Sequence, residues 1–180
     1  MKNGGIMNKR EKIKTVFLYG VLICYILLLI KILLLSRISN SELRSINFIP
    51  FHSIKEYIFS SSATIKKFTS GNVGGNIVIF IPLGTYLVLF KKDKRVRTNL
   101  LFIFIVSLSV EIIQGLLSIG ASDIDDIILN CLGGLIGILG YKFLLFILRD
   151  EKKVNTAITI LSAIGLPCIL FCLFMMRMRF

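Results

Sequence analysis

The chain has 180 residues, of which 55% are hydrophobic, and its mean hydropathy is +0.82. This apolar share exceeds that of an ordinary soluble domain and excludes a single small soluble core. The net charge of +12 does not indicate nucleic-acid binding, because the Lys and Arg residues form short clusters between apolar runs, with no basic stripe interleaved with aromatic residues. We therefore predict an all-α, polytopic membrane protein, a helical bundle of about five transmembrane helices and one interfacial amphipathic helix, with the lipid bilayer as its partner and no nucleic acid.

The cysteines and the single histidine, His52, do not suggest a metal or disulfide site. All four cysteines lie inside apolar runs, and neither a Cys-x-x-Cys motif nor a Cys/His pairing exists, so we interpret them as small apolar core residues. We expect no cofactor. The cysteines are Cys24, Cys131, Cys168 and Cys172.

Residues 1–15 are polar and basic and are predicted to be a cytoplasmic N-terminal segment. Met7 is an alternative start, since the residues that follow it already supply a basic flank. The first transmembrane helix is predicted at residues 16–35. We interpret it as a signal anchor, because its apolar stretch is too long for a signal peptide and no small-residue cleavage site follows.

Residues 36–71 form the one long loop, predicted on the outer side. Within it, apolar residues recur at helical spacing between positions 54 and 68, opposite Lys55, Glu56, Lys66 and Lys67. This pattern predicts an amphipathic helix that lies on the membrane surface.

Residues 72–148 are predicted to form a three-helix core, with spans near 73–90, 100–119 and 127–148. Pro82 lies within the first of these and leaves the carbonyl of Val78 without its helical partner, which predicts a kink. Gly133 and Gly137 form the Gly-x-x-x-Gly pattern of close helix packing, and Gly134 shares a helix face with Gly137. Residues 149–180 are predicted to be a basic loop followed by a C-terminal transmembrane helix near 156–176.

Basic residues concentrate in the loops at 91–97 and 149–153, whereas the turn at 120–126 contains three Asp and no Lys or Arg. By the positive-inside rule, the N-terminus is cytoplasmic and the acidic turn is extracytoplasmic, in a multi-pass protein of the plasma membrane. Arg177 and Arg179 oppose an outward C-terminus, so the orientation of the last helix stays open.

This topology brings polar residues of three antiparallel spans to a similar depth, about 6 to 12 Å below their outer ends at a helical rise of about 1.5 Å per residue. Asp125 lies on the rim above them. We predict one outward-facing polar pocket, with the interfacial helix over or beside it. Its candidate ligand-binding residues are Asn76, Glu111, Gln114, Asp123, Asp126 and Asn130.

A structural interpretation stands beside this functional one. Asn76 and Asn130 are typical hydrogen-bond partners between membrane helices, and three aspartates in a loop are often merely a solvated turn. Glu111 is different, because an ionisable group within a span is costly and by default suggests function, although a protonated, hydrogen-bonded Glu is tolerated.

Four short stretches are similar to the VanZ-like membrane proteins: NFIPF (47–51), GNIVIFIPLG (75–84), EIIQ (111–114) and SDIDDIILNCLGGLIG (122–137). Their order and spacing are retained over residues 47–141. The resemblance implies a helical membrane protein of the bacterial cell envelope, and the family's named member is associated with reduced susceptibility to the glycopeptide teicoplanin. The resemblance also implies that Pro82, Gly84 and Gly134 are helix-packing positions. Many members have an Arg before the aspartates, where this chain has Ala121 and Ser122.

Three functions remain open at this stage. The first is a non-enzymatic protein that binds a lipid-linked wall precursor, an envelope lipid or an amphipathic glycopeptide in the polar pocket. The second is a metal-dependent enzyme acting on lipid-linked phosphates, with Asp123, Asp126 and Glu111 as weak Mg²⁺ candidates; no catalytic nucleophile is identified. The third is a proton- or cation-coupled transporter, suggested by Glu111 and Pro82. The oligomeric state stays open.

Overall fold

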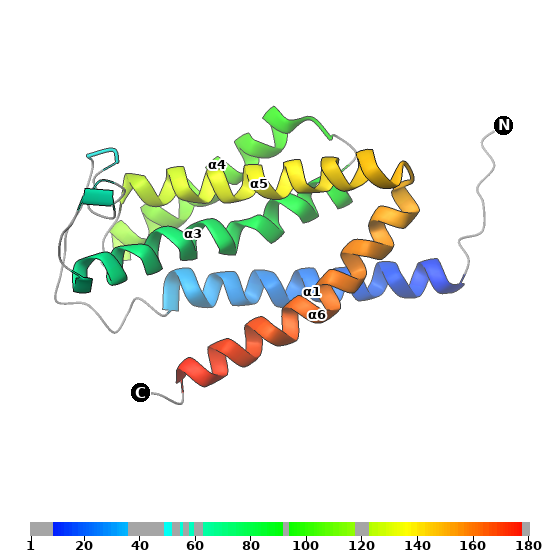
Figure 1. Cartoon of the computed structure of the whole chain (residues 1–180), viewed down its shortest axis with the longest axis horizontal. Coiled ribbons are helices and arrows are strands. Elements are labelled where there is room, and N and C mark those ends of the chain that lie inside the picture. The colour runs from blue at the N-terminus through cyan, green and yellow to red at the C-terminus, as the bar shows by residue number, and fades with distance from the viewer. Residues whose placement is uncertain are drawn as a thin grey trace. The chain divides into compact units, whose positions relative to one another are not determined.

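The computed structural model describes residues 9–35, 49–51, 55, 58–59, 63–91, 94–117 and 123–177. The described residues are helical apart from short connections (Figure 1). The elements are helix α1 (Lys9–Ile30), which continues into the π-helix η1 (Lys31–Leu35), and helices α3 (Ala63–Phe90), α4 (Val96–Leu117), α5 (Ile124–Leu148) and α6 (Glu151–Arg177). The all-α prediction is confirmed.

Four stretches are long and apolar enough to cross a membrane: Lys12–Leu34, Asn72–Phe90, Val96–Leu117 and Ile124–Leu148. They match the first four predicted spans to within a few residues. Many of their large apolar side chains are exposed in the isolated chain, among them Val16, Leu116 and Phe146. Apolar surface of this extent has to face lipid, and the protein is therefore a multi-pass membrane protein.

Two predicted elements remain predictions. The predicted fifth span lies in α6, which is helical throughout its length and contains Pro167, but it stays a prediction as a membrane span. The predicted interfacial helix stays a prediction too, because the structure describes only Lys55, Ile58 and Phe59 between residues 52 and 62. Its second half, from Ala63 onwards, is the first part of α3. Hydropathy marks where a helix leaves the apolar part of the bilayer, and the helix itself continues past that point.

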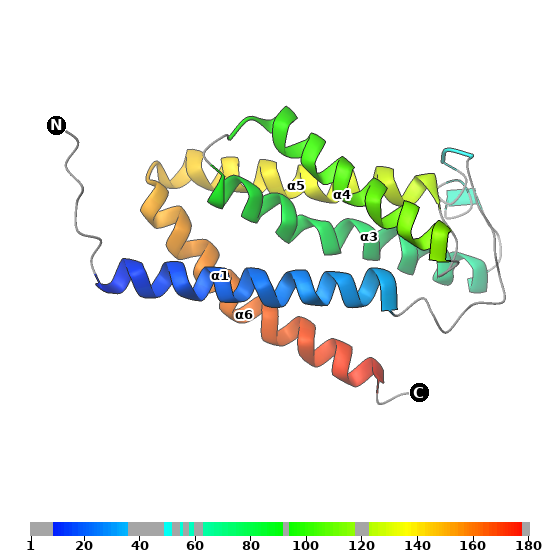
Figure 2. The ribbon, with the colours of Figure 1, turned by 180° about the vertical axis from the view of Figure 1, so that it is seen from behind.

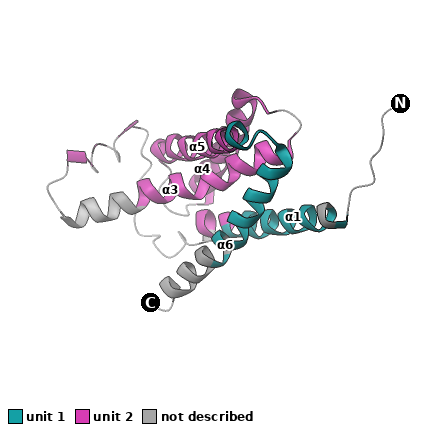
Figure 3. Ribbon diagram, turned by 45° about the vertical axis from the view of Figure 1, so that its right-hand side comes forward, with its two compact units in different colours: residues 1–28, 145–180 teal, residues 29–144 magenta. Residues whose placement is uncertain are grey.

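The chain divides into two compact units (Figure 3). We call residues 29–144 the core unit, and residues 1–28 with 145–180 the terminal unit. In the core unit, α3, α4 and α5 lie side by side (Figures 1 and 2). In the terminal unit, α6 crosses α1 (Figures 1 and 2).

Glycines set the distance between α3 and α5 in the core unit. A Cβ atom on Gly133 would lie 2.1 Å from the carbonyl oxygen of Ile77, and one on Gly137 would lie 2.0 Å from that of Ile81. Gly84 faces Gly134 in the same way, with a Cβ 2.0 Å from the Gly134 oxygen. The two backbones are thus in direct contact, as glycines allow in membrane helices.

Two further contacts complete this interface. The hydroxyl of Thr85 donates to the carbonyl of Gly137 at 3.2 Å, and also to Ile81 on its own helix. On another side of α5, the side chain of Ile103 from α4 fills the space beside Gly134, where a Cβ would lie 2.4 Å from its terminal carbon. Close packing of all three helices therefore depends on the small residues of α5.

Candidate functional site

The start of α5 is a capped helix end that carries the acidic residues. Asp123 precedes the helix, and its Oδ1 accepts a hydrogen bond from the backbone N–H of Asp125 at 3.0 Å, the usual role of an N-cap aspartate. Asp125 and Asp126 follow in the first turn, where the positive end of the helix dipole favours negative charge. Both side chains are buried, at 0% and 2% exposure, so they point into the protein.

Asp126 connects α5 to α3. Its Oδ1 accepts hydrogen bonds from the side-chain amides of Asn76 and, at 3.4 Å, Asn72. The two asparagines are four residues apart on one face of α3, which is why both reach the same carboxylate. Asp126 and Asn76 are both buried, so removal of either side chain leaves a buried polar group without this partner.

Asp125 connects α5 to the segment that precedes α3. Its Oδ1 accepts a hydrogen bond from the backbone N–H of Phe51. Phe51 has a φ of 65°, in the left-handed region, which costs roughly 1–2 kcal/mol for a residue other than glycine. The bond to a buried carboxylate helps to hold this unfavourable backbone conformation, and it aligns the stretch 49–51 with the start of α5.

Glu111 connects α4 to the start of α5. Its Oε2 accepts a hydrogen bond from the backbone N–H of Asp123 at 3.0 Å, and its side chain is only 4% exposed. Glu111 therefore holds the residue that caps α5. The cost of burying a charged group falls when it accepts such hydrogen bonds.

Two amide side chains make further cross-links between helices. Asn130 donates from Nδ2 to the hydroxyl of Ser107 at 2.9 Å, joining α5 to α4. Gln114 donates from Nε2 to the carbonyl of Leu33 at 2.7 Å, joining α4 to η1. Leu33 lies near the end of its helix, where backbone carbonyls lack helical partners.

The same two amides each retain an acceptor. Gln114 Oε1 and Asn130 Oδ1 are buried, and no donor among the described residues reaches them. A buried carbonyl without a donor costs about 1–3 kcal/mol. Such a carbonyl retains the capacity to accept a hydrogen bond.

The model of the VanZ/LLP1 family matches residues 17–148 of this chain. Protein VanZ of Enterococcus faecium is 30% identical over 128 residues, which cover 68% of this chain and 71% of that relative. This chain belongs to the VanZ family. No solved structure matches it.

In this VanZ-family protein, the four stretches that carried the resemblance meet at the start of α5. Phe51 ends the first, Asn76 lies in the second, Glu111 begins the third, and Asp123 to Asp126 open the fourth. Each of the first three hydrogen-bonds to a residue of the fourth. Segments that are far apart in the sequence of this VanZ-family member thus form one cluster.

Among the predicted site residues of this VanZ-family protein, Asn76, Glu111, Asp123 and Asp126 come together in the cluster. Gln114 and Asn130 hydrogen-bond instead to Leu33 and Ser107. The candidate set omitted three residues that the structure adds: Asn72, Ser107 and Asp125. Asn72 and Ser107 each lie four residues before a candidate, a spacing that was a usable signal.

The weak metal prediction gains no support from the geometry. Within the described residues of this VanZ-family member, no group of three or more His, Cys, Asp or Glu side chains is arranged to hold a metal ion. The Asp123 and Asp126 oxygens described above face backbone and amide N–H groups instead.

Proposed function

We propose that this protein acts in the bacterial cell envelope, where it lowers susceptibility to teicoplanin-type glycopeptides by binding an amphipathic glycopeptide or a lipid-linked wall precursor at the start of α5. One observation carries the proposal: four separate stretches of a VanZ-family chain converge on one buried polar cluster. If the cluster served only to hold the helices together, apolar packing and glycines would do so at a lower desolvation cost. The same helices already pack through glycines.

The chemistry of the cluster supports a ligand that donates hydrogen bonds. Carboxylates of Glu111, Asp125 and Asp126 provide the acceptors of the cluster. Sugars, amides and amines of a glycopeptide or a wall precursor are donors of the matching kind. By the predicted topology, the acidic turn faces the side where these ligands occur.

A second candidate is a proton- or cation-coupled transport step. It is favoured by the burial of Glu111, Asp125 and Asp126, because ionisable residues within a membrane bundle are typical of proton and ion pathways. Ion flux in proteoliposomes separates it from binding: a binding protein gives no flux above that of empty vesicles.

The first test is complementation in a glycopeptide-sensitive bacterium, with the minimal inhibitory concentrations of teicoplanin and vancomycin measured in parallel. We expect the wild type to raise the teicoplanin value several-fold, and Glu111→Gln and Asp126→Asn to lose most of that gain at equal membrane levels. Both substitutions keep the size of the side chain and remove its charge.

The matched control is Asp150→Asn, which removes an acidic charge outside the matched residues 17–148. We expect this variant to behave as the wild type. The proposal is overturned if the well-expressed wild type changes neither value, or if Glu111→Gln and Asp126→Asn both equal the wild type.

A further inference from the structure

The terminal unit contains a groove that the proposed function does not use. It has a volume of about 390 Å³, in the range of small-molecule sites. Helix α1, the last residue of α5 and the first turns of α6 form it. Its lining residues are Lys14, Leu148, Lys152, Lys153, Thr156, Ala157 and Ile160.

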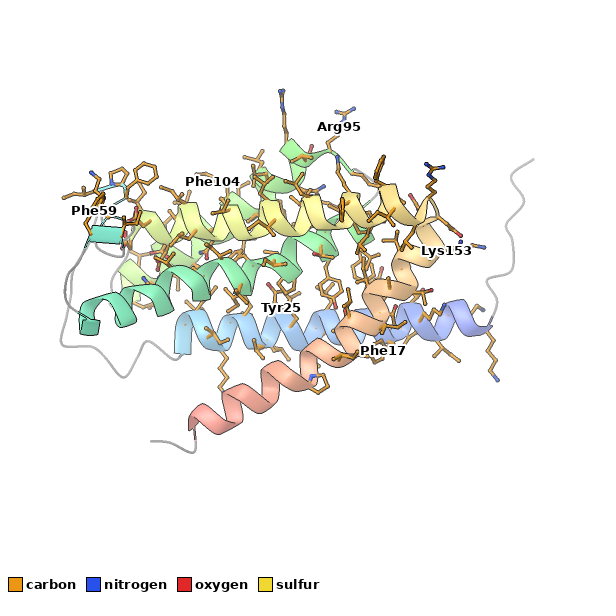
Figure 4. All side chains as sticks on the ribbon, in the orientation of Figure 1. Phe17, Tyr25, Phe59, Arg95, Phe104 and Lys153 are labelled. Carbon is orange, nitrogen blue, oxygen red and sulfur yellow. The ribbon has the colours of Figure 1, made fainter. Side chains whose placement is uncertain are left out.

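The lining has a basic part and an apolar part. Three lysines provide the basic part, and Lys153 projects from the first turn of α6 (Figure 4). Leu148, Ala157 and Ile160 provide the apolar part, and Ile160 is 55% exposed. A groove with this division matches an amphipathic molecule that has an anionic head and an apolar tail.

Lys14 is held in position within the groove. Its Nζ donates to the hydroxyl of Thr156 at 2.9 Å, and that hydroxyl donates to the carbonyl of Lys152 at 2.8 Å. An ammonium group has three N–H donors, so the bond to Thr156 leaves two that can reach an anion. The side chains of Lys152 and Lys153 are exposed at the same groove.

The positions of Lys152 and Lys153 are electrostatically unfavourable with respect to the dipole of α6. They lie in the first turn of α6, where the helix dipole disfavours positive charge. Asp150 and Glu151 offset part of this unfavourable interaction with the helix dipole. Asp150 Oδ1 accepts a hydrogen bond from the backbone N–H of Lys152 at 2.8 Å. Neither acidic residue lines the groove. A bound anion would stabilise the lysines and the helix end together.

The groove lies at the ends of two candidate membrane spans. Lys14 is in the first turn of the span Lys12–Leu34, and Leu148 is the last residue of the span Ile124–Leu148. Span ends coincide with the headgroup region of a bilayer. By the predicted topology this is the cytoplasmic side, where basic pockets between membrane helices bind anionic lipids.

We propose that this groove binds an anionic glycerophospholipid. The ammonium groups of Lys14, Lys152 and Lys153 contact the phosphate of the headgroup, and one acyl chain lies along Leu148, Ala157 and Ile160. This site is separate from the acidic cluster, which belongs to the other end of α5.

The test uses the full chain, purified in a neutral detergent, with thermal unfolding and native mass spectrometry as readouts. Phosphatidylglycerol and phosphatidylcholine with the same acyl chains are added at equal concentrations. We expect phosphatidylglycerol to remain bound and to raise the unfolding temperature, and phosphatidylcholine to do neither. The variant K14Q/K152Q/K153Q should lose roughly a hundredfold in affinity for phosphatidylglycerol, since each of the three surface lysines contributes roughly fivefold.

The control variant R95Q/R97Q/K142Q removes the same charge from exposed positions in the core unit and should bind as the wild type. An arm with glycerol phosphate distinguishes a lipid from a free phosphate, because without an acyl chain it should give no shift. The proposal is overturned if the wild type binds both lipids equally, if the two triple variants lose affinity equally, or if glycerol phosphate protects as well as the lipid does.

Discussion

The acidic start of α5 and the basic groove at the start of α6 differ in charge and in exposure. At the start of α5, Asp125 and Asp126 are at most 2% exposed and hold their partners inside the protein. At the start of α6, the groove lysines Lys152 and Lys153 are exposed. A buried charge must be satisfied by fixed partners, or folding is penalised, whereas an exposed charge keeps donors for a ligand. The acidic cluster is therefore part of the fold as well as a candidate site, and the basic groove is available for binding.

This comparison predicts that substitutions in the acidic cluster affect folding and that substitutions of the groove lysines affect binding alone. The largest effect is expected in the middle of α5, where its backbone touches that of α3. In Gly137→Val, the added Cβ would lie 2.0 Å from the Ile81 oxygen, so α3 and α5 must separate. We expect a loss of at least about 3 kcal/mol in the free energy of unfolding, measured by denaturant titration in micelles.

Gly140 provides the control, because no heavy atom lies within 4 Å of a Cβ at that position. Gly140→Val should change stability by no more than about 0.5 kcal/mol. Equal losses in the two variants would show that the backbone contact between α3 and α5 is not what holds the core unit together.

A smaller loss in the free energy of unfolding is expected for Asp126→Ala. The amide donors of Asn76 and Asn72 lose their carboxylate in a buried place, which costs about 2–3 kcal/mol. Asp150→Ala is the comparison, because it removes an exposed helix cap and should cost about 1 kcal/mol. If Asp126→Ala unfolds no more easily than Asp150→Ala, burial does not distinguish the start of α5 from the start of α6.

The smallest effect is expected for Lys153→Gln. In neutral detergent without anionic lipid, the free energy of unfolding should stay within about 0.5 kcal/mol of the wild type, because the side chain is exposed and is replaced at the surface. Unfolding curves for the two proteins test this directly. A loss above about 1 kcal/mol would mean that this lysine belongs to the fold and not to a binding surface.

The acidic cluster could be predicted from sequence only in part. Helical spacing identified Asn76, Glu111, Asp123 and Asp126 as polar residues of neighbouring spans. It did not identify the buried role of Asp125, because its partner is the backbone N–H of Phe51, 74 positions away. A backbone donor has no sequence signature, so no residue pattern can indicate such a pair.

The sequence alone determined that the chain is helical, that it crosses a membrane, and approximately where four of its spans lie. These properties depend on the local run of apolar residues, because a bilayer selects helices by their length and hydropathy. The order of the polar motifs also identified the family.

Only the tertiary structure decided which carboxylate meets which donor, and that α3 and α5 touch through Gly84, Gly133, Gly134 and Gly137. It also joined lysines of α1 and α6 around one groove. These outcomes depend on the register and rotation of one helix against another. Side chains from the whole interface set that register together, so it cannot be read from one segment at a time.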